Sequence, residues 1–476
     1  MNRAGATRMA QNPTPRERTV PRPLLRTLDV MALVIGIVVG AGIFSVPAVV
    51  AANSGSGTTL MLAWVVGGAL SLAGALCYAE LATSYPHAGG EYHFLRLAFG
   101  DKVAFLFAWA RLTVIPTGSI ALLGFVFGDY ASQMLPLYGE WSSPMYAAIA
   151  VIVLTAINMV GLKSGKRTQN LLTLLQVGGV VAIIVAGLAL PLSGTSLPVL
   201  QTGTQATQWG LVLIFVMLAY GGWNEAAYMS AEVVGANRNL PRALVWSIAA
   251  ITALYLLMNL AYLRVLGLAD MGESPAVAAD MMGRVLGGRG AQVISAAVAV
   301  AALTSMNATM LMAARTTYAF GRAAPMFEPL GRWNPRLNAP VHAFLVQAAI
   351  ALALVGLGTL TRHGFTTMVE YTAPVFWLFF LLTGVALFVL RARARPGMTR
   401  PFSVPLYPLT PLVFCAMCGY LLYASIRHTG TGAMVGLAVL AVGAVVLLAG
   451  GEKAVPRRNP DAEFPVQTDA PEEGEA

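Results

Sequence analysis

Charged side chains are scarce in this sequence of 476 residues, where Asp, Glu, Lys and Arg together make up only 11%. Apolar side chains make up 57%, and a water-soluble domain of this size needs a larger charged fraction on its surface. Five segments carry no charged residue at all, namely 168–224, 291–314, 371–390, 401–426 and 428–451. This scarcity excludes a soluble globular protein and favours a protein embedded in a membrane.

Cysteine and histidine are also rare. The three cysteines, Cys77, Cys415 and Cys418, all lie in apolar runs, where a thiol behaves as a small hydrophobic group. A disulfide framework is therefore excluded, and residues 131–143 hold no cysteine for a disulfide-linked ancillary subunit. The five histidines show no metal-ligand spacing, so neither a metal site nor a cofactor is expected.

Catalytic and nucleic-acid motifs are missing. A membrane-embedded enzyme needs a nucleophile and a base, or clustered carboxylates, that converge within the membrane. The apolar segments contain no Ser-His-Asp pattern and no His/Asp cluster, so an enzyme is not expected. There is no RNA or DNA motif either. A binding-only sensor stays open as an alternative, although the polar ends of the chain are too short for a large signalling domain.

Long apolar runs are what the sequence does have. A helix needs about 20 mostly apolar residues to cross a membrane, and the hydropathy pattern predicts twelve such helices. The protein is thus expected to be an all-α polytopic membrane protein that binds membrane lipid around its outer faces. The predicted helices are 29–52, 59–85, 102–131, 143–162, 168–190, 209–234, 241–265, 289–320, 340–360, 366–391, 404–426 and 430–450.

The distribution of Lys and Arg predicts the orientation. An even helix count places both termini on one side, and the tails and loops of that side hold 23 of the 30 Lys and Arg residues. The opposite loops hold five. Because basic loops stay in the cytoplasm, both termini are expected to be cytoplasmic in a cell inner membrane. This topology accounts for the net charge of +9 without a nucleic-acid partner.

Glycine is concentrated in the first helix, where residues 36–44 read GIVVGAGIF. Each glycine inside a helix costs roughly 1 kcal/mol relative to alanine, so another role must explain Gly40 and Gly42. One explanation is close helix packing through small residues. The other is an unwound break whose free N–H groups bind a carboxylate.

The sixth helix favours the break. Residues 218–232 read LAYGGWNEAAYMSAE, with Gly221 and Gly222 at the midpoint of the membrane. Interruptions in the first and sixth helices are what an inverted five-plus-five repeat with a central binding site predicts. The expected organisation is a tail at 1–28, a ten-helix core at 29–391 made of repeats 29–190 and 209–391, two further helices within 404–450, and a partly disordered tail at 451–476.

Four segments resemble one family. Residues 78–100 (YAELATSYPHAGGEYHFLRLAFG), 158–169 (NMVGLKSGKRTQ), 220–244 (YGGWNEAAYMSAEVVGANRNLPRAL) and 400–408 (RPFSVPLYP) are similar to motifs of amino acid permeases in the amino acid-polyamine-organocation superfamily, in particular its L-type transporter branch. The resemblance implies a LeuT-like fold in which ten helices form the inverted repeat and the last two are peripheral. It also implies secondary active transport of an amino acid.

The resemblance further implies a substrate site at the two breaks. The substrate carboxylate would meet backbone N–H groups of the first break, and the ammonium would meet carbonyl groups that end the preceding half-helices. This placement is electrostatically favourable, since the carboxylate of a zwitterion is attracted to the positive N-terminus of a half-helix and its ammonium to the negative C-termini. The implied residues are Val38, Gly40, Ala41, Gly42, Ile43, Leu218, Ala219, Tyr220, Gly221 and Gly222.

Two departures from the family concern the gate and the coupling ion. Leu218 aligns with a position that is aromatic in related permeases, so two alternatives stay open: a looser occlusion of the substrate, or occlusion by Phe215 or Tyr220 instead. Gln176 aligns with a lysine on the fifth helix, and a neutral amide cannot titrate as lysine does.

Thr304 and Ser305 on the eighth helix carry hydroxyls that would suit a sodium site, but helix hydroxyls more often bond back to the preceding turn. A sodium site is therefore not expected. Proton-linked uptake or obligatory exchange is the main hypothesis for coupling.

Charges within the membrane are costly and mark functional candidates. Glu80 and Glu232 are expected near the cytoplasmic ends of their helices, each paired with Arg or Lys as a gate latch. Glu225 follows the second break by three or four residues and is the preferred proton carrier. A polyamine or a cationic amino acid is the alternative cargo, but it would require an acidic pocket and Glu225 is the one carboxylate placed near the break. Neutral amino acids are therefore the leading cargo. Oligomeric state stays open.

Overall fold

The computed structural model describes residues 25–87, 89–137, 139–159, 166–189, 206–334, 337, 339–394, 400–428 and 430–451. Within these ranges the chain forms helices, turns and two isolated bridges, without a strand. The predicted tails at 1–28 and 451–476 lie almost entirely outside the described residues. The predicted all-α architecture is confirmed.

The predicted membrane spans are present. Nine helices of the described chain are long and apolar enough to cross a membrane, and three shorter apolar helices (Thr27–Val38, Gln176–Ala189 and Trp209–Ala219) accompany them. Together these helices occupy the twelve predicted segments. The three short ones correspond to the first, fifth and sixth predicted helices, and two of those three are the helices that the glycine pattern marks as interrupted.

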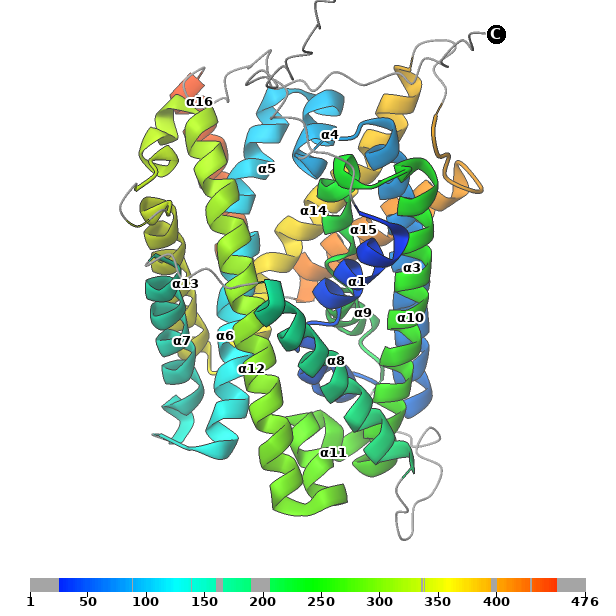
Figure 1. Cartoon of the computed structure of the whole chain (residues 1–476), viewed down its shortest axis with the longest axis vertical. Coiled ribbons are helices and arrows are strands. Elements are labelled where there is room, and N and C mark those ends of the chain that lie inside the picture. The colour runs from blue at the N-terminus through cyan, green and yellow to red at the C-terminus, as the bar shows by residue number, and fades with distance from the viewer. Residues whose placement is uncertain are drawn as a thin grey trace, which may run out of the picture.

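The helices follow one another in the order shown in Figure 1. In the first part of the chain these are α1 (Thr27–Val38), η2 (Ala41–Phe44), α2 (Val46–Ala52), α3 (Gly57–Ser84), α4 (Gly90–Phe99), α5 (Asp101–Thr113), α6 (Ile115–Met134), η3 (Gly139–Trp141), α7 (Ser142–Met159) and α8 (Lys166–Ala189). The rest of the chain forms α9 (Trp209–Ala219), η5 (Trp223–Glu232), α10 (Ala236–Val265), α11 (Gly267–Glu273), α12 (Val277–Ala323), η6 (Pro325–Gly331), α13 (Val341–Thr361), α14 (Gly364–Ala392), α15 (Leu409–His428) and α16 (Thr431–Gly450).

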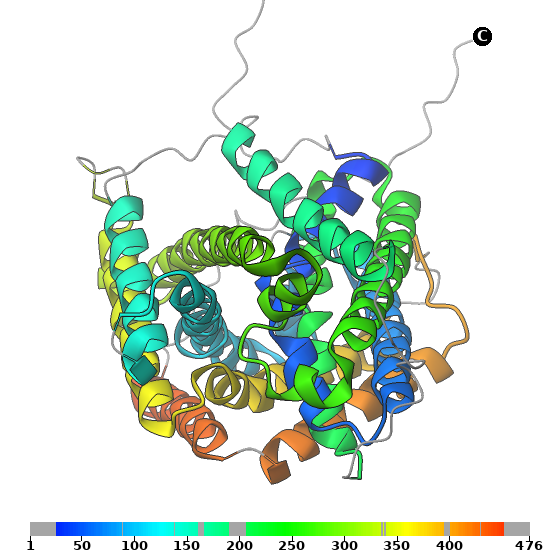
Figure 2. The ribbon, with the colours of Figure 1, turned by 90° about the horizontal axis from the view of Figure 1, so that it is seen from below.

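Packing between helices places the interrupted ones in the interior. Helix α6 contacts α12, α7 and α14, and α10 contacts α3 and α1. Figure 2 shows α3 and α10 side by side at one edge of the molecule and α7 and α13 side by side at the other. The last two helices, α15 and α16, pack against α14. Helix α1 packs against α10 and η5, and α9 packs against α2, α3 and α15, so the interrupted helices contact the longer ones.

The two ends of the molecule differ in structure. Figure 1 shows α4 and the start of α5 at one end and α11 at the other. Helix α12 runs most of this length, and Gly287 (φ 70°) interrupts its helical geometry near the α11 end. That position explains why hydropathy predicts only residues 289–320 as the eighth membrane helix.

Candidate functional site

The first helix is interrupted where its glycines are. Helix α1 ends at Val38, Gly40 is extended (φ −86°, ψ −175°), and the short 3-10 turn η2 leads into α2. Pro47 lies in the first turn of α2, where a missing N–H costs nothing. Glycine and the nearby proline thus split one apolar run into two half-helices, as the sequence predicts.

The sixth helix breaks at Gly222. Helix α9 ends at Ala219, and Gly222 has a left-handed backbone (φ 113°) that side-chain-bearing residues rarely adopt. A Cβ atom at Gly222 would lie 2.8 Å from Cγ2 of Ile37, on the last turn of α1. Glycine is therefore required both by the turn and by the close approach of the two interruptions.

A tyrosine hydroxyl ties the two interruptions together. The hydroxyl of Tyr255, on α10, lies 2.9 Å from the carbonyl oxygen of Val38 and 3.0 Å from that of Ala219. These carbonyls end α1 and α9, where carbonyl groups lack intrahelical donors. The Gln176 side-chain amide donates to the carbonyl of Val39 in the same break. Sequence reasoning missed Tyr255, although a buried tyrosine in an apolar helix needs a partner for its hydroxyl.

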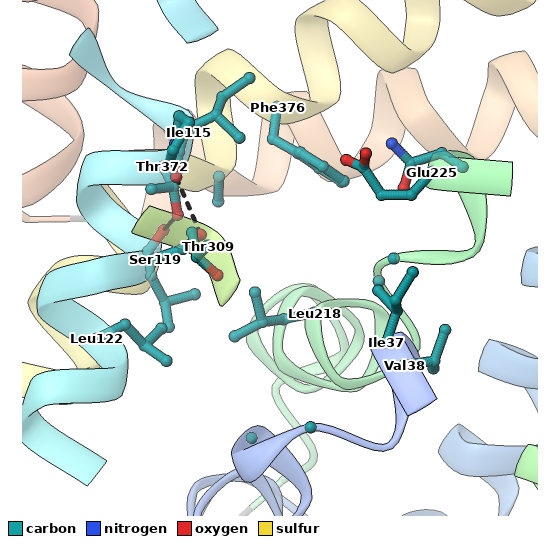
Figure 3. A pocket seen from close by; sticks show the side chains of 18 of the residues that line it. Ile37, Val38, Ile115, Ser119, Leu122, Leu218, Glu225, Thr309, Thr372 and Phe376 are labelled. Carbon is teal, nitrogen blue, oxygen red and sulfur yellow. Dashed lines mark hydrogen bonds between the residues drawn. The ribbon is translucent and has the colours of Figure 1, made fainter. Parts of the chain in front are cut away.

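A cavity of about 310 Å³ adjoins both interruptions. Small-molecule sites have volumes of roughly 300–1,000 Å³. Besides the two breaks, α5, α6, α12 and α14 line the cavity. Figure 3 shows Leu218 pointing from α9 toward the α6 wall with Ser119 and Leu122, while Glu225 and Phe376 lie at the other side.

Ten of the residues named from sequence line this cavity. They are Val38, Gly40, Ala41, Gly42, Leu218, Ala219, Gly221, Gly222, Glu225 and Ser305. The structure brings these residues together; their roles in binding stay predictions.

Five other named residues lie outside the lining. Ile43 is buried but does not line the cavity. The Gln176 side-chain amide donates to the Val39 carbonyl. The Thr304 hydroxyl donates back to the Val300 carbonyl of its own helix at 2.8 Å. The Tyr220 hydroxyl donates to the Trp64 carbonyl at 2.9 Å. Phe215 stacks on Phe365 with ring centroids 6.3 Å apart. Both aromatic gate candidates therefore face away from the cavity in this conformation.

Charged side chains form one end of the cavity. Arg111 on α5 donates from Nη1 to Oε1 of Glu225 at 3.2 Å, and its guanidinium lies 5.4 Å from the ring centroid of Tyr228. Oε2 of Glu225 is buried, and no donor from the described chain reaches it. Glu91 on α4 also lines the cavity. Glu91 belongs to the family-like segment 78–100 but is not among the site residues named from the sequence.

A second cavity of about 760 Å³ lies on the opposite side of the interruptions. Its lining comes from the half-helix α2 and from residues near the ends of α6, α13 and α14, including Asp129 and Arg362. Phe365, which stacks on Phe215, belongs to this lining. Two cavities thus flank the breaks, one beside α1 and η5 and the other beside α2.

The predicted pairing of Glu80 with an arginine is present, while its role as a gate latch stays a prediction. Oε1 of Glu80 accepts from Nε of Arg391 at 2.7 Å, and Oε2 accepts from Nη2 of Arg391 and from the backbone N–H of Val404 at 2.7 Å. This contact joins α3, α14 and the segment before α15. The side chain of Glu232, the other predicted latch residue, lies outside the described residues.

Comparisons with known proteins agree with this geometry. The family model for "Amino acid permease" matches residues 25–447. The chain is 31% identical over 408 residues to b(0,+)-type amino acid transporter 1 of Mus musculus, covering 84% of this chain and 82% of the relative. It is 30% identical over 426 residues to the serine/threonine exchanger SteT of Bacillus subtilis, covering 87% and 94%. It is 28% identical to large neutral amino acids transporter small subunit 2 of Mus musculus, covering 88% and 79%.

Proposed function

This chain belongs to the amino acid permease family, and from that premise we propose that it moves neutral amino acids across the cell inner membrane by alternating access. Amino acid transport or exchange is the activity that its relatives share by name. The neutral cargo, the coupling and the orientation are the proposed parts. Proton-linked uptake and obligatory exchange are the two couplings under consideration.

One observation carries the proposal: both helix interruptions line the same cavity. A bound amino acid would place its carboxylate at the N–H groups of Ala41, Gly42 and Ile43, which begin the second half of the first helix. Its ammonium would face the carbonyl ends of α1 and α9. The Tyr255 hydroxyl supports this assignment, because its contacts to Val38 and Ala219 hold those ends next to one another.

The side-chain region of the cavity favours an uncharged substrate. Leu218, Leu122 and Phe376 line it, and apolar lining stabilises apolar substrate groups. The hydroxyls of Ser119 and Thr309 bond back to carbonyls of their own helices at 2.9 Å each. They are therefore less available to a polar substrate side chain.

A cationic amino acid is the second candidate, and Glu225 favours it. Its Oε2 is buried without a donor, and leaving such an acceptor unsatisfied costs about 1–3 kcal/mol or more. A substrate ammonium would satisfy this oxygen. Competition of L-lysine with L-leucine for uptake distinguishes the two candidates, because an apolar pocket alone would favour L-leucine.

The proposed orientation places both termini in the cytoplasm. The Lys and Arg distribution supports it, and it assigns the 310 Å³ cavity to the cytoplasmic side of the breaks and the 760 Å³ cavity to the outer side. Residues 131–143 hold no cysteine, which supports a transporter without a disulfide-linked ancillary subunit.

The test is exchange in proteoliposomes. Vesicles loaded with L-serine, L-threonine, L-leucine or L-lysine are assayed for uptake of the same labelled amino acids. The site variant is Gly42→Leu, because Gly42 lines the cavity and a Cβ there meets nothing within 4 Å. Uptake is expected to fall to the level of empty liposomes. The control is Gly356→Leu on the exposed face of α13, where a Cβ also meets nothing within 4 Å. Equal uptake by both variants would refute the site.

A further inference from the structure

Glu91 is a buried carboxyl held by neutral donors. Its side chain is 3% exposed although it belongs to α4, which is not one of the membrane-spanning helices. The Tyr78 hydroxyl donates to Oε1, and the Asn224 amide lies 3.5 Å from the same oxygen. The Tyr228 hydroxyl donates to Oε2 at 3.1 Å. The carboxyl is thus satisfied when ionised but has no ion-pair partner within 4.0 Å in the described chain.

These donors belong to different elements of the fold. Tyr78 is on α3, whereas Asn224 and Tyr228 are on η5, the second half of the interrupted sixth helix. Gly90 permits the contact, since its φ is 45° and a Cβ there would lie 2.8 Å from the Tyr228 ring. The Glu91 carboxyl therefore fastens η5 to α3 and α4 beside the cavity that it lines.

We propose that Glu91 is the proton-binding site through which the proton gradient drives transport. The ionised carboxylate accepts hydrogen bonds from α3 and η5 together and holds η5 in place. A proton taken up from the outer side makes it a neutral acid, which accepts more weakly and releases η5. After the conformational change the proton leaves into the cavity that Glu91 lines, on the proposed cytoplasmic side. This inference rests on the proposed transport function.

The other described carboxyls near the cavities differ from Glu91 in their partners. Glu225 pairs with Arg111 at 3.2 Å, and protonation would break that pair. Glu80 is bonded to Arg391 and the Val404 backbone. Asp129 lies at the second cavity and accepts from the Ser143 hydroxyl at 2.6 Å.

The electrostatic surroundings of Glu91 support titration near neutral pH. Burial raises the pKa of the Glu91 carboxyl to about 7, while the Tyr78 hydroxyl and the Arg111 charge oppose that rise. The other charged or titratable groups that face it are Glu225 and Tyr228, both on η5. Arg393 on α14 contacts α4 by donating a hydrogen bond from Nη1 to the Ala98 carbonyl oxygen at 2.9 Å.

The neighbouring histidines do not compete in this pH range. Burial lowers the pKa of His93 to about 4, and it also lowers the pKa of His87. The rings of the two histidines stack 4.1 Å apart, on the approach to α4 and on α4 itself. Both are therefore neutral around pH 7, where Glu91 changes its charge.

The experiment compares exchange with gradient-driven uptake in proteoliposomes, using whichever of L-serine, L-threonine, L-leucine and L-lysine the wild type exchanges fastest. Into vesicles without internal amino acid, the wild type is expected to show several-fold faster uptake when the outside is at pH 6 and the inside at pH 7.5. Glu91→Gln is expected to lose this stimulation while exchange persists. Glu328→Gln, an exposed carboxyl that pairs with Arg332 and lines neither cavity, is the control and is expected to keep both activities.

Glu91→Asp covers the case in which Glu91→Gln does not fold. It keeps a carboxyl in a changed position, so the pH of half-maximal stimulation is expected to shift; an unchanged midpoint would contradict the proposal. Exchange without any response of the wild type to the proton gradient, or a full response of Glu91→Gln, would overturn this inference alone. Absence of both exchange and uptake in the wild type would instead overturn the proposed function.

Discussion

The carboxylates of Glu80 and Glu225 both pair with arginine, yet their surroundings differ. At Glu80 both oxygens are occupied, by Arg391 and by the Val404 N–H, and the Arg391 guanidinium lies 3.7 Å from the ring centroid of Tyr407. At Glu225 one oxygen accepts from Arg111 and the other is buried without a donor. The Glu80 contact joins α3 and α14 to the loop before α15. The Glu225 pair lines the cavity.

The difference separates a structural ion pair from one available to a ligand. A buried network stabilises a single arrangement when all of its members are satisfied. A member that is left unsatisfied in a cavity can gain a partner when a ligand binds. We therefore expect removal of Glu80 to affect stability, and removal of Glu225 to affect what is bound.

The largest expected effect is at the latch. Glu80→Ala leaves the Arg391 guanidinium, whose side chain is only 12% exposed, without its carboxylate. Removing one partner of a buried pair costs about 3–5 kcal/mol, so the apparent melting temperature in detergent should fall by many degrees. The control is Glu328→Ala, which breaks an exposed pair with Arg332 and should cost about 0–1 kcal/mol. Equal melting temperatures for the two variants would mean that the Glu80 contact does not stabilise the fold.

Glu91 extends the comparison of Glu80 and Glu225 to a third buried carboxyl, which accepts hydrogen bonds but has no ion-pair partner in the described chain. Its pKa is raised by burial from 4.5 to about 7, so the folded protein binds this proton more tightly than the unfolded chain. The resulting stabilisation, about 3 kcal/mol, is complete below pH 4.5 and is lost as the pH rises through 7. The melting temperature of the wild type should therefore fall relative to that of Glu91→Gln between pH 5 and 8. Parallel pH profiles would contradict this assignment.

The sequence predicts the helices and their interruptions better than it predicts the contacts between side chains. Hydropathy locates all twelve helical segments, and the glycines at 40, 42, 221 and 222 locate both interruptions, because apolar length and backbone freedom are local properties. The fully bonded latch at Glu80 is also predicted, from a charge near a helix end. The five-plus-five repeat boundaries stay predictions.

The rest depends on contacts between distant residues. Tyr255 lies 217 positions from Val38, and Glu91 lies 137 positions from Tyr228, so no local pattern pairs them. The direction of Phe215 and Tyr220 away from the cavity likewise follows from packing against Phe365 and Trp64. Side-chain direction in a helix that is apolar on all sides cannot be derived from periodicity.

A smaller effect is expected at Glu225. Glu225→Gln keeps the size of the side chain but removes the charge that would attract a cationic substrate. If L-lysine is a substrate, its apparent affinity relative to L-leucine should fall about tenfold, which is about 1.4 kcal/mol, as measured by competition for uptake in proteoliposomes. The melting temperature should change much less than in Glu80→Ala. A large loss of stability with unchanged selectivity would make Glu225 a structural residue like Glu80.

The smallest expected effect concerns the hydroxyl that joins the two interruptions. Tyr255→Phe keeps the ring beside Trp64 but leaves the carbonyls of Val38 and Ala219 without this donor. One hydrogen bond contributes about 0.5–1.5 kcal/mol, so both stability and the geometry of the ammonium site should suffer, and the KM for the transported amino acid should rise about fivefold. Tyr371→Phe is the matched control, since that buried hydroxyl donates to the Thr113 carbonyl at 2.9 Å and Tyr371 does not line the cavity. It should lower the melting temperature similarly and leave KM unchanged. An equal rise in KM for both variants would show that Tyr255 supports the fold in general and not the substrate site.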